Sequence, residues 1–190
     1  MTTESAQGKK KLAGWAIASL LTGVFLGGSV SLGGLNAAMD WTNREEFCIS
    51  CHEMQATPYS EYQDSAHDLN RAGVKTTCSD CHVPKEWGSK VLAKIWASKD
   101  LVHHFLGTID SPEKYENRRL HMAKSVWQFM KKTDSKTCRN CHAVAAMNLD
   151  QQEGRARRKH RMLVVNEKTC IDCHKGIAHE LPDGFEEDGV

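Results

Sequence analysis

The feature that most constrains this chain is the placement of its 8 cysteines, all of which fall in four copies of one pattern. Each copy reads Cys-x-x-Cys-His, and the copies run over Cys48–His52, Cys78–His82, Cys138–His142 and Cys170–His174. No cysteine is left over for a disulfide framework or a free thiol. The spacing therefore predicts one shared role for all four pairs.

Cys-x-x-Cys-His is the attachment signature of c-type haem, in which two thiols form thioethers and the histidine reaches the iron from one face. Zinc ribbons and thiol redox proteins also use Cys-x-x-Cys, but they do not require a histidine after every second cysteine. We therefore expect four covalently bound haem c groups. The attachment residues would be Cys48, Cys51, Cys78, Cys81, Cys138, Cys141, Cys170 and Cys173, with His52, His82, His142 and His174 beside the irons.

A haem iron has two axial positions, so a second ligand is sought for each haem among the six histidines outside the motifs. The motifs form two pairs, and each pair encloses one isolated histidine, His67 or His160. Both are favoured as ligands because they stand in equivalent places. His179 lies five residues after His174, too close to serve the same iron easily, so it would serve a neighbouring one.

The remaining histidines, His103, His104 and His121, lie in expected helices and are interpreted as surface or packing residues. This leaves the first motif without a second histidine. Its Met54, two residues beyond His52, is interpreted either as a packing residue or as a ligand in place of the missing histidine.

A 28-residue stretch from Leu12 to Met39 carries no charged side chain, which exceeds the ~20 residues that cross a bilayer as a helix. Lys9–Lys11 precede it, so the positive-inside rule predicts a cytoplasmic segment 1–11, an anchor 12–39 and a periplasmic domain 40–190. A cleaved signal peptide is the alternative, although its apolar part would be unusually long. Gly23 and Gly27 form a G-x-x-x-G pair that could support a homodimer, although glycine is common in such helices.

The fold is expected to be mostly α with extensive loops: one transmembrane helix, then a small tetrahaem domain built from a duplicated dihaem unit. The repeats would span about 45–85 and 135–180, since 77–82 and 169–174 read almost alike. Apolar spacing predicts helices over 88–106 and 112–132. In the second helix the expected buried positions are Leu120, Val126, Trp127 and Phe129. The formal net charge of +1 argues against nucleic-acid binding.

Four stretches carry a resemblance to a known family: Cys48–Met54, Ser65–His67, Ala97–Asp100 and Cys170–His179. With the four motifs, they resemble the NapC/NirT family of membrane-anchored tetrahaem quinol dehydrogenases, of which NrfH and CymA are relatives. The Lys-Gly-Ile-Ala-His-Glu-Leu-Pro ending is more similar to NapC/NirT than to NrfH.

The resemblance implies that the first haem is on the quinol side, with Met54 in place of or beside His52. It implies that His179 binds the second haem, His67 the third and His160 the fourth. Asp100 matches the acidic residue of the quinol site, and Lys94 matches a lysine near it.

The resemblance further implies that the chain oxidises quinol in the bacterial inner membrane and passes electrons to a periplasmic reductase, most of all a nitrate reductase. A nitrite or other terminal reductase as acceptor, or a haem relay that never oxidises quinol, is the alternative. The basic stretch Arg155–Arg161 would pair with haem propionates or dock an acidic partner, or form an ordinary solvated helix face.

Overall fold

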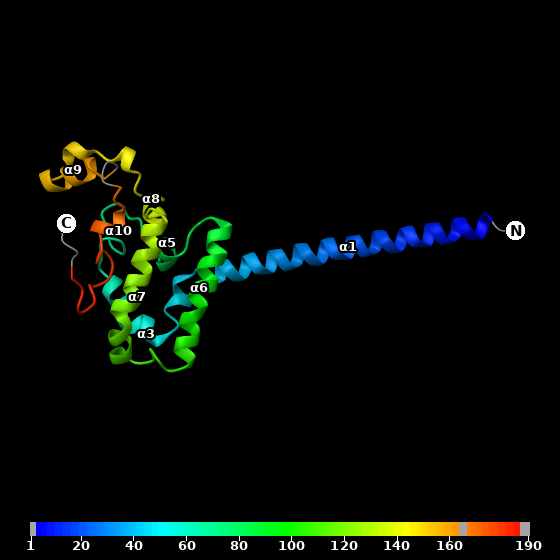
Figure 1. Ribbon diagram of the computed structural model, residues 1–190, viewed down its shortest axis with the longest axis horizontal. Helices are drawn as coiled ribbons and strands as arrows, with labels where there is room; N and C mark the ends of the chain where they lie inside the picture. Colours follow the sequence, from blue (N-terminus) through cyan, green and yellow to red (C-terminus); the bar gives the residue numbers. More distant parts are fainter. Residues whose placement is uncertain (1–2, 164–166, 187–190) are drawn as a thin grey trace. The chain divides into compact units, whose positions relative to one another are not determined.

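The computed structural model describes residues 3–163 and 167–186, and within these ranges it contains helices, turns and loops but no strand (Figure 1). The chain divides into two compact units, Met1–Thr42 and Asn43–Val190, which are described separately.

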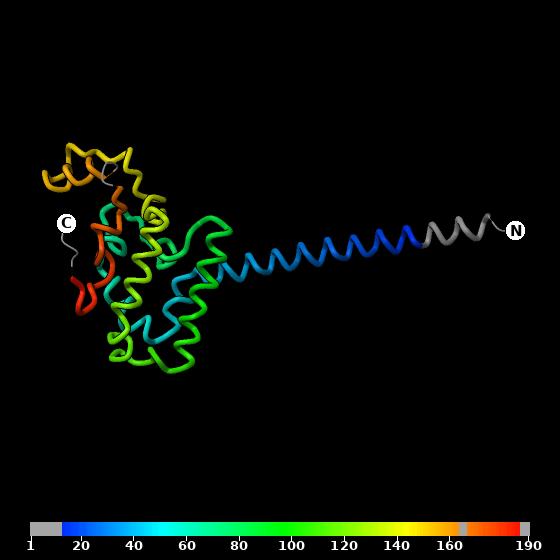
Figure 2. Tube along the Cα trace, in the orientation of Figure 1, coloured from blue at the N-terminus to red at the C-terminus, as the bar shows by residue number. Residues whose placement is uncertain are grey.

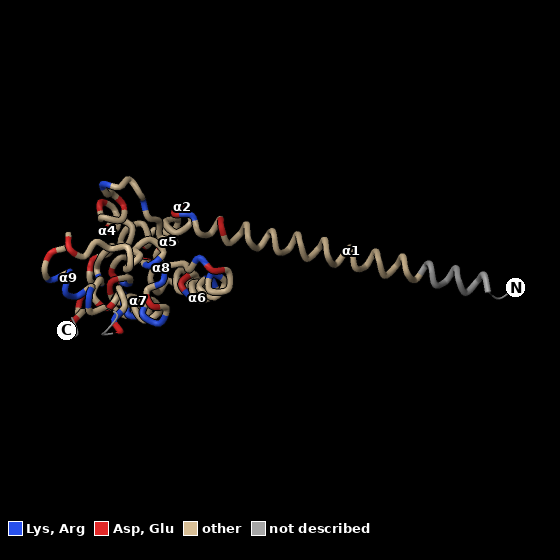
Figure 3. The backbone as a smooth tube through the Cα atoms, turned by 90° about the horizontal axis from the view of Figure 1, so that it is seen from above, with Lys and Arg blue, Asp and Glu red and all other residues tan. Residues whose placement is uncertain are grey.

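The first unit is one helix, α1 (Thr3–Trp41). Its stretch Ala13–Trp41 contains an 18-residue segment with a mean hydropathy of 1.7, and none of that segment is buried in protein. From Ala13 onward, α1 carries no Lys, Arg, Asp or Glu until Asp40 (Figure 3). A helix satisfies its own backbone hydrogen bonds and can therefore expose an apolar surface to lipid. The expected anchor, 12–39, lies within α1 and is long and apolar enough to cross a membrane.

The second unit is a set of short helices around two long ones (Figure 2). In chain order they are α2 (Glu45–Cys48), α3 (His52–Met54), η1 (Gln55–Tyr59), α4 (Ser60–Tyr62), α5 (Cys78–His82), α6 (Trp87–Phe105), α7 (Pro112–Lys132), α8 (Lys136–Arg139), η2 (Val144–Ala146), η3 (Leu149–Gln151), α9 (Gly154–Arg161) and α10 (Cys170–Cys173). Each Cys-x-x-Cys-His motif lies in or next to one of the short helices.

The two long helices, α6 and α7, begin and end within one residue of the predicted bounds. They run in opposite directions in Figure 1 and are joined by a short turn. In that turn Gly107 adopts a φ of +65°, a conformation that is unfavourable for residues with a side chain. The Ser111 hydroxyl caps α7 by accepting a hydrogen bond from the Lys114 N–H at 3.3 Å, and Pro112 occupies the first helical position.

The protein core of this unit is small. Its buried apolar side chains, among the described residues, are Tyr62, Ile109, Met130 and Ile171. In α7 the buried residue is Met130, whereas the expected positions Leu120, Val126 and Trp127 are half-buried. The prediction that Phe129 is buried was wrong, since its side chain is 37% exposed. One residue turns a helix by more than a quarter of a circle, so a boundary residue such as Phe129 easily falls outside the buried face.

The second motif of each pair starts in the same way. Thr77 and Thr169 cap α5 and α10 with φ/ψ of −97°/166° and −99°/167°. In each case the cap N–H donates to an aspartate three residues on, at 2.9 Å to Asp80 and 2.8 Å to Asp172. The likeness covers these two motifs; duplication of a whole dihaem unit stays a prediction.

Candidate haem-binding site

The cysteines of neighbouring motifs lie next to one another. All eight are free, and a hydrogen bond with Cys78 lowers the pKa of Cys48 to about 7 and raises that of Cys78. Burial raises the pKa of Cys81 to about 11, with a further contribution from Cys138. The pKa of Cys138 is likewise raised by burial and by Cys170. The four motifs therefore follow one another in space in the order of the sequence.

Each motif histidine faces a second histidine ring. The ring centroids are 6.1 Å apart for His52 and His104, 6.2 Å for His82 and His179, 6.1 Å for His67 and His142, and 6.0 Å for His160 and His174. Two metal–nitrogen bonds of about 2 Å, together with half the width of each ring, give a centroid separation of about 6 Å. All four pairs therefore have the spacing of two imidazoles on opposite sides of one metal ion.

Three of these pairs are the ones that the resemblance implied for the second, third and fourth haems. The two isolated histidines, however, are not equivalent in the structure. His67 faces His142 of the other motif pair, whereas His160 faces His174 of its own pair. Their equivalent places in the sequence therefore did not lead to equivalent partners.

A cavity of about 1100 Å³ opens between these elements. Seven of the eight cysteines line it, as do the three pairs that contain His82, His142 and His174. Protein interiors rarely enclose spaces much larger than a water molecule, so thiols and paired imidazoles around so large a cavity fit haem c well. Arg155 and Lys159 of α9 also line the cavity, where they could meet haem propionates.

The surrounding protein keeps several of these histidines neutral. Burial, with a smaller contribution from the nearby His179, lowers the pKa of His82 to about 4. Burial also lowers the pKa of His174 and His179. Neutral imidazole is the form that binds a metal ion, so these environments favour ligation.

Two of the paired histidines have an amide or carboxylate oxygen at Nδ1. Gln152 Oε1 lies 2.6 Å from His160 Nδ1, and Glu53 Oε1 lies 2.5 Å from His104 Nδ1. An amide or carboxylate oxygen accepts, so Nδ1 carries the proton and Nε2 is left to bind a metal ion. Hydrogen bonds of this kind orient metal-binding histidines in many proteins.

His104 was expected to be a surface or packing residue, and the sequence did not pair it with a motif histidine. In the structure its half-buried ring faces His52 and contacts the buried Glu53. The adjacent His103 instead places Nδ1 2.9 Å from Thr108 Oγ1 and 3.0 Å from Arg118 Nη1. Sequence spacing offers one signal, since Asp100 and His104 are four residues apart and share a helix face. That signal does not reveal Glu53.

The predicted quinol-site residues and Met54 lie near the main cavity or the first motif. Asp100 borders the main cavity, and loss of water around its carboxyl raises its pKa against the opposing effect of Lys99. Burial lowers the pKa of Lys94, whose charge acts on Cys48 of the first motif. Met54 ends α3, is 37% exposed and also lines the cavity.

The chain matches the NapC/NirT cytochrome c family, N-terminal region, over residues 10–184. It is 51% identical to the cytochrome c-type protein NapC of Escherichia coli K12 over 88% of this chain and 84% of the relative. It is 48% identical to the denitrification system component NirT of Stutzerimonas stutzeri, over 89% and 84%. A tetraheme cytochrome-c type protein of Allochromatium vinosum is 47% identical, over 84% and 86%. No solved structure matches the chain.

Proposed function

The chain belongs to the NapC/NirT cytochrome c family, and from this we propose that it oxidises membrane quinol and delivers the electrons to a periplasmic reductase. That it is an electron-transfer cytochrome of the c type follows from the family and from its four motifs. The observation that carries the finer proposal is the place of Asp100, a carboxyl of raised pKa that borders the cavity lined by the haem-binding residues.

Quinol oxidation releases two electrons and two protons. A haem iron takes up one electron at a time and no proton, so two ferric irons are reduced for each quinol and the protons must go elsewhere. Asp100 is a suitable acceptor because its raised pKa brings it closer to neutral pH, where a general base works best. Lys94 would donate a hydrogen bond to a quinol oxygen. The burial that lowers the pKa of Lys94 also keeps water from competing with the quinol for this hydrogen bond.

The arrangement of the binding residues suits electron transfer. The adjoining thiols order the motifs from the first to the fourth, and paired histidines would hold the second, third and fourth irons with little rearrangement between their redox states. The proposed iron ligands outside the motifs are His67, His160 and His179. Arg155 and Lys159 would hold propionates at the cavity, while the exposed remainder of α9 would dock an acidic partner.

The proposed location is the bacterial inner membrane, with 1–11 in the cytoplasm and the domain from residue 40 in the periplasm. The basic run Lys9–Lys11 supports this orientation. Gly23 and Gly27 would let two copies of this helix pack closely in a homodimer.

We propose a nitrate reductase as the acceptor because the chain resembles NapC and NirT throughout. A nitrite or other terminal reductase is the second candidate, since one relative is named as a denitrification component and another, 42% identical, is the cytochrome c-type protein TorY. The TorY relative is longer, and this chain covers 47% of it.

The test is the rate at which a quinol reduces the haems of the full-length membrane protein. Replacing Asp100→Asn should slow this rate by about 10²- to 10⁴-fold, the usual contribution of a general base. Reduction by dithionite should be unchanged. Asp150→Asn, at a 79% exposed position on η3, is the matched control. An unchanged rate in Asp100→Asn would remove this residue from the site, and a wild type that quinol cannot reduce would favour the relay alternative.

A further inference from the structure

The histidine pair formed by His52 and His104 has no role in the function proposed above. We infer that His104 is the second axial ligand of the haem attached to Cys48 and Cys51, opposite His52, and that Glu53 is its positioning residue. The inference concerns ligation alone and does not depend on quinol as the electron donor.

The first support is distance. His52 and His104 have ring centroids 6.1 Å apart, within the 6.0–6.2 Å range of the other three pairs. The rings are inclined at 60°, and the other pairs range from 27° to 82°. The ring separation that suits the three other pairs to binding one metal ion is therefore also present between His52 and His104.

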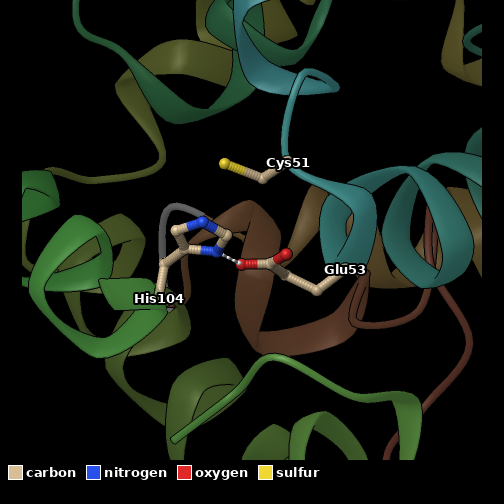
Figure 4. A group of neighbouring side chains, drawn as sticks. All are labelled: Cys51, Glu53 and His104. Atoms are coloured by element: carbon tan, nitrogen blue, oxygen red, sulfur yellow. Dashed lines mark hydrogen bonds and ion pairs between the residues drawn. The ribbon is translucent and has the colours of Figure 1, made fainter. Parts of the chain in front are cut away.

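The second support is the hydrogen bond at Nδ1. Figure 4 shows the His104 ring beside Cys51 and Glu53, with a dashed line from its Nδ1 to the Glu53 carboxylate. The distance from Nδ1 to Glu53 Oε1 is 2.5 Å. The Glu53 side chain is only 2% exposed, so this carboxylate is held in place by the surrounding protein. His160, which the resemblance assigns to the fourth haem, has the same arrangement with Gln152. In both cases the ring is oriented and Nε2 remains for the metal ion.

The third support is the proximity of an attachment cysteine. The ligand atoms of Cys51, Glu53 and His104 all lie within 4.8 Å of one another. In a c-type cytochrome Cys51 is a thioether and cannot bind a separate cation as a thiolate. The cluster is therefore part of the haem site, and its imidazole is the group suited to iron.

The two competing ligands are less suitable. Arg118 Nη1, 3.0 Å from His103 Nδ1, can only donate, so Nδ1 accepts and the proton of the neutral ring lies on Nε2, the atom that an iron would need. Met54 is 37% exposed and lines the main cavity, whereas neither His52 nor His104 lines it. Two bound histidines would leave no open position on this iron, so a quinol would be met beside Asp100, one turn before His104 on α6.

The experiment counts high-spin and low-spin haems in the oxidised, full-length protein by electron paramagnetic resonance and visible spectroscopy. The wild type should show four low-spin haems with two histidines each. His104→Ala should convert one of the four to high spin, and added free imidazole should restore it. Covalent haem content, measured by pyridine haemochrome, should stay at four per chain. His103→Ala and Met54→Leu are the matched controls and should leave all four haems low-spin.

Two further variants keep the test decisive. If His104→Ala does not acquire four haems, His104→Met should retain them and give one haem the spectrum of histidine–methionine ligation. Glu53→Gln should keep all haems low-spin and raise the midpoint potential of one. The inference is overturned by a high-spin haem in the wild type, by an unchanged spectrum in the matured His104 variant, or by a high-spin haem in either control.

Discussion

Arg119 and Glu61 form a two-pronged ion pair, with Arg119 Nη1 2.7 Å from Glu61 Oε1 and Nη2 2.6 Å from Oε2. The same groups bind the backbone next to His179: the Glu180 N–H donates to Glu61 Oε2 at 2.9 Å, and its carbonyl accepts from Arg119 Nη2 at 2.7 Å. This network ties α4 and α7 to the loop that carries a proposed haem ligand.

Loss of this ion pair should destabilise the domain. Both side chains are largely buried, 11% and 12% exposed. Glu61→Gln removes this buried counter-charge and leaves Arg119 with only the exposed Glu116, 3.0 Å away, so it should lower the free energy of unfolding by about 2–4 kcal/mol. The measurement is urea unfolding of the haem-loaded protein, followed by haem absorbance. Lys114→Ala removes the exposed pair with Asp110 and should cost less than about 1 kcal/mol. Equal costs would show that burial does not strengthen the Arg119 pair.

The histidines proposed for the second, third and fourth haems should act one at a time. His179→Ala, His67→Ala and His160→Ala should each convert a single haem to high spin, because each ring faces a different motif histidine. Double variants should convert two haems. Magnetic circular dichroism of the oxidised protein counts them, with the exposed His121→Ala as the control. A variant that leaves all haems low-spin would remove that histidine from the ligand set.

Some of this arrangement could be read from the sequence for clear physical reasons. Attachment chemistry fixes the spacing of the cysteines, and the hydrophobic periods of 88–106 and 112–132 placed α6 and α7 almost to the residue. The sequence does not reveal which helices come into contact when long loops separate them. His104 was set aside because a histidine in an amphipathic helix is usually a packing residue. Only folding brings Glu53, 51 positions away, against it.

The cap of α10 should make stability depend on pH in acid. Burial alone would raise the pKa of Asp172, but the ion pair with Lys131 at 2.9 Å and hydrogen bonds from Thr169 lower it from 3.8 to about 2. A carboxyl with a lowered folded pKa stabilises the protein fully above its unfolded pKa, and this contribution is lost as the pH falls through the folded pKa. The loss should therefore occur between about pH 4 and pH 2 and amount to on the order of 1–2 kcal/mol.

Unfolding measured across this range should show a smaller pH dependence in Asp172→Asn than in the wild type. Lys131→Met removes one of the favourable partners and keeps the Thr169 hydrogen bonds, so it should give an intermediate slope. Identical slopes in all three proteins would mean that other carboxyls account for the acid sensitivity.

The steady-state constants of quinol oxidation should separate the roles of Asp100 and Lys94. Lys94→Gln removes a hydrogen bond to bound quinol, so it should raise KM with little change in kcat if the bond is equally strong in the ground and transition states. Asp100→Asn should chiefly lower kcat, because the base acts only as the proton leaves. Steady-state quinol oxidation by the membrane-embedded protein measures both constants. The opposite pattern would exchange the assigned roles.

Gln152 should tune the haem that His160 is proposed to bind. Its amide oxygen accepts the His160 Nδ1 proton at 2.6 Å, and a stronger acceptor would make the imidazole a better donor to ferric iron. Gln152→Glu should therefore lower one midpoint potential, and Gln152→Leu should raise it. A tenfold change in the preference for ferric over ferrous iron corresponds to about 59 mV, so shifts of about 30–60 mV are expected in a redox titration. The exposed neighbour Gln151→Leu should shift none of the potentials. Shifts of the same sign in both Gln152 variants would show that packing, rather than the hydrogen bond, sets this potential.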